Sequence, residues 1–241
     1  MKNLKMKNVF TLVALVLSMA LSRTVSATQL ITNSDFESGT FAGWTVNAVG
    51  GFGNDFYVIP NGDPVPISGN PTAFNLGGGT FVAVSDQDGP GGEELRQGFT
   101  VAPGTTSLIL TFDWFNNTHD PYAGTAIDGS EQAGRVDILS AGALPFDVGA
   151  GVVMNLLLNA GSFTPLGTSI PWSPAFFDLS SLAPGAYEVR FGNGQCCSYQ
   201  EFGVDNVSLV ATSPVPEPST YLLLGTGLAG LLGYSRRQRK V

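Results

Sequence analysis

The sequence predicts an all-β protein: a two-sheet β-sandwich of jelly-roll type, flanked by an N-terminal signal helix and a short hydrophobic C-terminal helix. Three observations lead to this prediction. Short runs of residues alternate between apolar and polar, which is the pattern of strands with one buried face. The runs end at turn-forming residues, and the chain contains 31 Gly and 15 Pro, which favours strands joined by turns over helices. Finally, both ends of the chain differ in composition from the part between them.

Two stretches show the alternation most clearly. "TSLILTFDWFNN" is expected to place Leu108, Leu110, Phe112 and Trp114 on the core face. "GAYEVRFGN" is expected to turn Tyr187, Val189 and Phe191 inward and Glu188 and Arg190 outward. Five further short runs end at Gly, Pro, Ser or Asn: "GGTFVAVSD", "GRVDILSA", "GVVMNLLLN", "PAFFDLSS" and "GVDNVSLVA". We expect eight to eleven strands in the whole domain. So many short, regularly punctuated strands are typical of sandwiches and jelly rolls.

The C-terminal end combines a glutamate flanked by prolines, a short hydrophobic segment and a cluster of basic residues. The acid lies within Val215, Pro216, Glu217, Pro218 and Ser219, and the basic residues are Arg236, Arg237, Arg239 and Lys240. The 16 uncharged residues from 219 to 234 would form a helix of about 24 Å, short of a bilayer core of about 30 Å. This short hydrophobic segment therefore suits transient placement in the inner membrane better than permanent anchoring, although a weak tail anchor is the alternative.

This three-part order resembles the PEP-CTERM sorting domain of exported proteins. The resemblance covers residues 214–241 and implies processing by an exosortase-type enzyme in a Gram-negative bacterium that makes extracellular polysaccharide. It further implies a location in the cell envelope, at the cell surface or in the extracellular matrix. Proteins with this tail share no single activity, so the resemblance predicts export and leaves the chemistry open.

The N-terminal end has the order of a secretory signal peptide. Lys2, Lys5 and Lys7 precede an apolar stretch over residues 9–21, and small residues lead up to Ala27. We expect cleavage after Ala27; the alternative is an uncleaved anchor. The predicted domains are therefore a signal peptide (1–27), a β-sandwich (28–213) and a sorting domain (214–241).

The predicted sandwich is strongly acidic. Residues 28–213 contain 18 carboxylates, three arginines and no lysine, a net charge of 3 − 18 = −15, against −8 for the whole chain. Such a surface repels nucleic acid and anionic lipid, so neither is an expected partner. It attracts divalent cations.

Two end motifs of this domain resemble those of galactose-binding-like jelly rolls, the fold of many carbohydrate-binding modules. They are "TNSDFESGTFAGWTV" near the start and "EFGVDNVSL" near the end. In such jelly rolls calcium is often held where the first and last strands meet, and Glu37 and Asp205 match those places. The "F-x-x-W" pattern in the first motif predicts that Trp44 is packed in the core.

Calcium is also expected from the residues themselves. Asn33, Asp35 and Glu37 alternate along an expected first strand, and Asp205 should face inward with Val207. An inward carboxylate needs a partner because an uncompensated buried charge costs several kcal/mol. Hard calcium suits carboxylates and carbonyls, while hydrogen bonds to backbone amides without metal are the alternative. "SDQDGPGGEE" offers a second acidic loop, with Asp86, Asp88, Glu93 and Glu94.

Polysaccharide is the expected ligand, through aromatic side chains in loops. Tyr57, Tyr122 and Trp172 lie near Pro, Gly or Asp outside the alternating runs, and sugar rings stack on such flat faces. Ordinary packing is the alternative for each residue. At the level of function, the alternative is a structural surface protein that acts through calcium bridging without a glycan pocket.

Catalytic residues are not evident. His119 is the single histidine and no G-x-S-x-G motif occurs, so nothing marks a serine hydrolase. Glycoside hydrolysis by a carboxylate pair is a minor alternative, because 18 acids allow many pairs. We therefore expect a protein that is not an enzyme. The adjacent Cys196 and Cys197 could form a disulfide with each other, bond to another molecule or remain free thiols.

Overall fold

The structure is a computed structural model that describes residues 25–50, 55–86, 89–118, 124–159, 163, 165, 167–197, 199–214 and 225–231. Residues 28–211 form one compact unit. Described residues beyond it belong to a second unit, in which residues 225–231 form one short helix. Within the described residues, no helix has the length and apolar character needed to cross a membrane.

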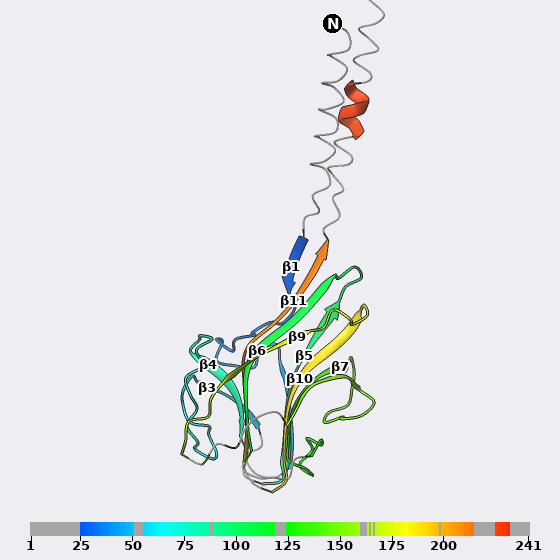
Figure 1. Ribbon diagram of the computed structural model, residues 1–241. Coiled ribbons are helices and arrows are strands. Elements are labelled where there is room, and N and C mark those ends of the chain that lie inside the picture. The colour runs from blue at the N-terminus through cyan, green and yellow to red at the C-terminus, as the bar shows by residue number, and fades with distance from the viewer. Residues whose placement is uncertain are drawn as a thin grey trace, which may run out of the picture. The chain divides into compact units, whose positions relative to one another are not determined.

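Eleven strands are described. In chain order they are β1 (Val25–Gln29), β2 (Thr45–Gly50), β3 (Asp55–Pro60), β4 (Phe81–Asp86), β5 (Gly91–Val101), β6 (Ser107–Thr118), β7 (Ala133–Ser140), β8 (Val152–Leu158), β9 (Ser173–Asp178), β10 (Gly185–Gln195) and β11 (Gln200–Pro214). The strands form two antiparallel sheets that pack as two layers (Figure 1). The predicted all-β sandwich is confirmed.

The two sheets have interleaved strand orders. The first, sheet A, runs β3-β4-β11-β6-β9, with β1 paired to β11 outside this path, and the second, sheet B, runs β2-β5-β10-β7-β8. Strands that follow each other in the chain, such as β5 and β6, therefore lie in different sheets. This crossing between layers is the connectivity of a jelly roll.

The core lies between the sheets and follows the predicted alternation. Leu108, Leu110, Phe112 and Trp114 of β6 are buried, at 0 to 9% exposure. Val189 and Phe191 of β10 face them, and the Phe112 and Phe191 rings meet edge to face at 5.2 Å between centroids. Trp44 is buried as predicted, and its Nε1 donates to the Asn33 carbonyl over 3.0 Å.

Arg190, on the outer face of sheet B, is expected to point outward from the core. This side chain does alternate away from the core, yet it is fully buried. The connection between β7 and β8 covers it, and Arg190 Nη1 donates to the Asp147 carbonyl over 2.7 Å. A strand pattern distinguishes two faces but does not reveal that a later loop folds over the outer one.

The prediction of a first strand over residues 33–37 is wrong. Residues 32–40 form turns, with φ of 45° at Asn33 and 54° at Phe36. These left-handed backbone angles are incompatible with a strand. The segment nevertheless lies along β11, because Val207 N donates to the Ser34 carbonyl over 2.8 Å.

Candidate functional site

Glu37 lies near enough to Asp205 for its charge to act on that carboxylate, although the two residues are not on paired strands. Glu37 Oε1 accepts hydrogen bonds from Thr80 N (2.6 Å) and Phe81 N (3.0 Å), and these bonds, led by that of Phe81, lower the pKa of Glu37. The Glu37 side chain is exposed. Its negative charge is one of the causes that raise the pKa of Asp205.

Asp205 is a fully buried carboxylate whose hydrogen bonds come from amides. Asn206 N donates to Oδ1 over 2.8 Å, and Asn75 Nδ2 donates to Oδ2 over 3.0 Å. Burial raises the pKa of Asp205 to about 7, and the charges of Asp113 and Glu37 contribute. No arginine compensates this charge, because each arginine of residues 28–211 is paired elsewhere.

Asn33 and Asp35 have local side-chain contacts instead. Asn33 Nδ2 donates to the Thr40 carbonyl over 2.7 Å, and Asp35 Oδ1 accepts from Glu37 N over 3.4 Å. Both contacts shape the turns of residues 33–40. No group of three or more His, Cys, Asp or Glu side chains in the described part of the chain is arranged to hold a metal. A cation at Glu37 and Asp205 would therefore need amide or carbonyl oxygens as its further ligands.

A surface cavity of about 420 Å³ opens beside this cluster, on sheet A. It is lined by Thr111, Phe112, Asp113, Pro174, Ala175, Phe176 and Asn206. Phe176 lies directly opposite Thr111 in the β6–β9 register and is 65% exposed. Because their strand neighbours Leu110 and Phe177 face the core, Thr111 and Phe176 point away from it. The cavity therefore combines an exposed aromatic ring with polar side chains.

Asn206 connects the cavity to the buried carboxylate. Its Nδ2 donates to Asp113 Oδ2 over 3.0 Å and to Asp205 Oδ2 over 3.2 Å. The residue has a φ of 51°, which asparagine tolerates better than most residues. Gly77 packs against the pair, since a Cβ there would lie 2.1 Å from Asp113 Oδ2. Asp113, Asn206 and Asp205 are therefore held in place by their own hydrogen bonds and by a glycine loop.

Sequence reasoning missed Phe176, Asp113 and Asn206. One signal was available: in "PAFFDLSS" two phenylalanines are adjacent, and in a strand one of them must point away from the core. Asp113 and Asn206 lie more than 90 residues apart in the chain, and only the order β11-β6-β9 brings them to one cavity.

The predicted aromatic ligand-binding residues Trp172 and Tyr57 do not line the cavity. Trp172 is half-buried, its Nε1 donates to the Ala73 carbonyl over 2.9 Å, and its ring meets Phe115 edge to face at 4.8 Å. Tyr57 lies on β3, at the opposite edge of sheet A from β9. Both pack against a small apolar cluster on the outer face of that sheet. Tyr122, like His119, lies outside the described residues.

The acidic loop "SDQDGPGGEE" contributes to two different polar clusters. Glu94 accepts from Arg96 and Arg190 in the ion-pair network of sheet B. Asp86 and Glu93 are fully buried without an arginine, and burial raises the pKa of Asp86 to about 7 and that of Glu93 well above its usual range. Each has one buried oxygen without a hydrogen-bond partner. Asp88 lies outside the described residues.

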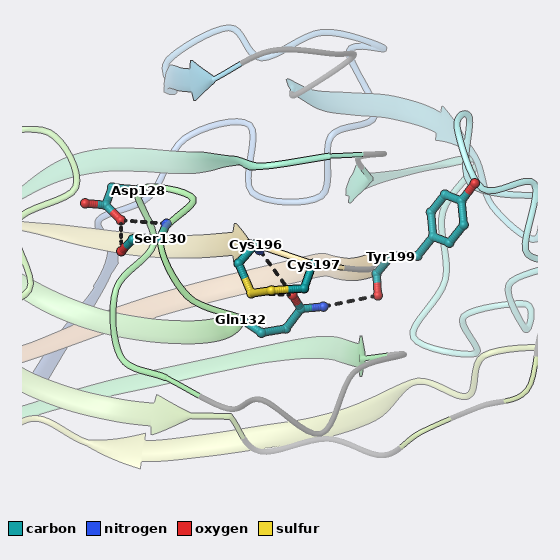
Figure 2. The surroundings of a disulfide bond; sticks show 6 residues. All are labelled: Asp128, Ser130, Gln132, Cys196, Cys197 and Tyr199. Atoms are coloured by element: carbon teal, nitrogen blue, oxygen red, sulfur yellow. Dashed lines mark hydrogen bonds between the residues drawn. A yellow bond between two sulfur atoms is a disulfide. The ribbon is translucent and has the colours of Figure 1, made fainter.

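The adjacent cysteines form a disulfide with each other in the connection between β10 and β11 (Figure 2). Gln132 Oε1 accepts from Cys196 N over 3.2 Å, and Gln132 Nε2 donates to the Tyr199 carbonyl over 3.4 Å. Figure 2 shows how this one amide side chain spans the connection. Cys196 is half-buried and Cys197 is exposed.

Solved structures with a similar fold come from several kinds of protein. The chain resembles TmCBM61, solved in complex with β-1,4-galactotriose (TM-score 0.46, 14% identity, 76% of this chain and 97% of that one). It also resembles the K3 cleaved adhesin domain of Lys-gingipain from Porphyromonas gingivalis W83 (0.46, 17%, 78% and 99%) and a cyclase from Fischerella sp. (0.49, 15%, 79% and 98%). These likenesses concern the sandwich fold.

No curated protein matches the sequence. A family model does match one segment: residues 214–240 match the PEP-CTERM protein-sorting motif. Val215 to Ser219 and the basic residues Arg236, Arg237, Arg239 and Lys240 lie within this match but outside the described residues. The motif identifies the chain as an exported protein that is sorted to the cell envelope and implies processing by an exosortase.

Proposed function

We propose that this protein is a non-catalytic component of the cell envelope or extracellular matrix of a Gram-negative bacterium, and that its sandwich binds extracellular polysaccharide. One observation carries the binding proposal: the exposed ring of Phe176 shares a cavity with a carboxylate and a carboxamide. The sorting motif supports export. It does not distinguish a binding module from a structural protein, so the proposal depends on the cavity.

The cavity offers the two kinds of contact that a sugar ring needs. The C–H face of a pyranose can stack on the exposed Phe176 ring. Asp113 Oδ2 already accepts from Asn206, which leaves Oδ1 available to accept hydrogen bonds from sugar hydroxyls. Because these residues lie on paired strands, the site exists before the ligand arrives, as is usual for ligand sites.

Trp172, the residue that precedes β9, extends this surface beyond the start of the strand. Trp172, Pro174 and Phe176 occupy alternate positions, so they follow one another on the same side of the sheet. A polysaccharide chain lying along the strand would meet Phe176 first and the half-buried Trp172 at one end. Trp172 is therefore proposed as an outlying contact that also stabilises the fold, whereas Tyr57 lies at the far edge of the sheet.

A glycan array that includes polysaccharide from the producing cells tests the binding. We expect saturable binding by the purified protein, and a loss of about tenfold or more in affinity for Phe176→Ala, which corresponds to about 1.4 kcal/mol. Phe74→Ala is the matched control, because Phe74 is 60% exposed but does not line the cavity. Equal losses in the two variants would show that Phe176 has no special role.

We further propose calcium as a structural ion at Glu37 and Asp205. Support comes from the burial of Asp205, the charge of Glu37 nearby and the absence of a compensating arginine. Two carboxylates with amide and carbonyl oxygens suit a hard cation. Calcium would neutralise the like charges that now raise the pKa of Asp205.

Thermal unfolding with calcium and with a chelator tests the metal. Binding to the folded state alone adds about 2.7 kcal/mol at 100-fold saturation, and Asp205→Asn should abolish this gain. The alternative function, a structural protein acting through calcium bridging, predicts calcium-dependent self-association and no binding to any glycan. A melting temperature that changes with neither calcium nor chelator would exclude a structural calcium ion.

A further inference from the structure

The disulfide between Cys196 and Cys197 does not close a long loop. The two residues are adjacent, with Cα atoms 3.7 Å apart. The stabilisation expected from a disulfide grows with the length of the loop that it closes, and no native disulfide can close a shorter one. Stability alone is therefore a poor explanation for this bond.

The strands on either side are held without the disulfide. Gln195, the last residue of β10, pairs with Gly91 of β5. Gln132 joins the two sides of the connection by accepting from Cys196 N and donating to the Tyr199 carbonyl (Figure 2). Opening the sulfur–sulfur bond would leave these contacts in place, so the bond can react while the protein remains folded.

The two sulfurs differ in their surroundings. Cys197 is exposed, so an external thiolate can reach its Sγ. The Sγ of Cys196, which is half-buried, lies 3.7 Å from Gln132 Oε1. A disulfide sulfur has no hydrogen to donate, but a thiol does. Gln132 is thus already placed to accept a hydrogen bond from Cys196 once the disulfide opens.

We propose that Cys197 is an attachment site for an external thiol, with Cys196 as its leaving group. The thiolate attacks Cys197 Sγ, a new sulfur–sulfur bond forms, and the Cys196–Cys197 bond breaks. The electron pair leaves on Cys196 Sγ, which takes a proton from water; the resulting thiol then donates a hydrogen bond to Gln132 Oε1. One disulfide replaces another, so no oxidant or reductant is consumed. After losing its proton to water, Cys196 can later attack Cys197 Sγ as a thiolate, which re-forms the Cys196–Cys197 bond and releases the attached group as a thiolate.

The electrostatic environment selects the thiol. Residues 28–213 have a net charge of 3 − 18 = −15. Asp128 lies in the surroundings of the disulfide (Figure 2), and its hydrogen bonds from Ser130 lower its pKa, so it is ionised at neutral pH. A negative site attracts cationic reactants and repels anionic ones, and salt weakens both effects. The attached partner is therefore a neutral or cationic thiol.

Three small thiols test the assignment in the folded full-length protein: cysteamine, 2-mercaptoethanol and mercaptoacetate, compared at equal thiolate concentration. After alkylation, peptide mass analysis should show the mixed disulfide on Cys197 and the alkylated thiol on Cys196. We expect rates to fall several-fold from cysteamine to 2-mercaptoethanol to mercaptoacetate at low salt, and to converge at high salt. Attachment to Cys196, or equal rates at low salt, would overturn the proposal.

Two variants separate this chemistry from a loss of structure. Gln132→Met removes the acceptor for the Cys196 thiol and should lower the equilibrium fraction of mixed disulfide several-fold. Asp128→Asn should speed the reaction with mercaptoacetate and slow that with cysteamine, with the folded state unchanged by circular dichroism. If wild-type exchange instead proceeds only at the rate of global unfolding, as measured by hydrogen exchange, the site is not accessible in the folded protein and the proposal fails.

Discussion

Asp205 shows how one buried side chain can make stability depend on pH. Its pKa is about 7 in the folded protein, against an ordinary value of 3.8. Between these values the folded state binds a proton that the unfolded state has lost, so the free energy of unfolding falls as pH rises. Above about pH 7 that loss is complete. Asp86, whose pKa is also raised to about 7, acts in the same direction.

We therefore expect the calcium-free protein to lose stability steadily between pH 5 and 7. Some carboxylates, such as Glu37 and Asp178, have a pKa that is lowered from ordinary values of 4.5 and 3.8. They change protonation below pH 5, so they do not affect stability in this window. Urea unfolding at a series of pH values in chelator should give a smaller slope for Asp205→Asn than for the wild type. Adding calcium should flatten the wild-type slope, because a bound cation keeps Asp205 ionised. An unchanged slope in the variant would contradict the pKa shift.

At the scale of the elements, an ion-pair network joins strands of sheet B. This network contains all three arginines of residues 28–211. Arg190 binds Asp137 over 2.5 Å and Glu94 over 3.3 Å, and Arg135 binds Asp137 over 2.7 Å. Although burial raises the pKa of Asp137, the hydrogen bonds of Arg135 and the charge of Arg190 lower it overall. Carboxylates and guanidinium groups on β5, β7 and β10 thus compensate one another beneath the β7–β8 connection.

Breaking this network from its centre should be costly. Arg190→Met leaves Glu94 and Asp137 buried with one fewer cation each, and removal of one partner from a buried ion pair typically costs about 3–5 kcal/mol. Glu188→Gln is the control, because its bond to Arg96 lies at the rim, where the Glu188 side chain is 28% exposed; we expect less than about 1 kcal/mol. Similar losses in equilibrium urea unfolding would show that the burial of Arg190 does not matter.

Alternation along single strands was predictable, and contacts between distant strands were not. The core faces of β6 and β10 follow directly from their sequences, because the period of two is a local property. Residues 33–37 show the limit: their polar alternation resembles a strand, but Asn33 and Phe36 adopt left-handed angles. The cavity depends on the order β11-β6-β9, which no local pattern specifies. The expectation that Glu37 and Asp205 act together comes from a family resemblance and not from a local pattern; the structure shows that the charge of Glu37 reaches Asp205, and the calcium site stays a prediction.

At the scale of the whole molecule, the described sandwich presents no lysine or arginine to its surroundings. Residues 28–213 contain three arginines and no lysine, and Arg96, Arg135 and Arg190 are 5%, 4% and 0% exposed. In the described part of the sandwich these arginines form ion pairs with Glu94, Asp137 and Glu188, and residues 28–213 keep a net charge of 3 − 18 = −15. Polysaccharides differ in charge, so this surface should discriminate among them.

We therefore expect the protein to bind neutral polysaccharide directly and acidic polysaccharide only through calcium. Contacts between Phe176 and an uncharged sugar involve no ion pair, so affinity for a neutral glycan should change little with salt. A uronic-acid polymer is repelled by the acidic surface, and divalent cations are needed to bridge the two sets of carboxylates. Isothermal titration of both polymers, at low and high salt, with calcium and with chelator, measures this difference. Phe176→Ala should weaken binding of the neutral polymer alone, because the calcium bridges do not require the ring. Tight binding of the acidic polymer in chelator would contradict this prediction, because the described part of residues 28–213 exposes no lysine or arginine.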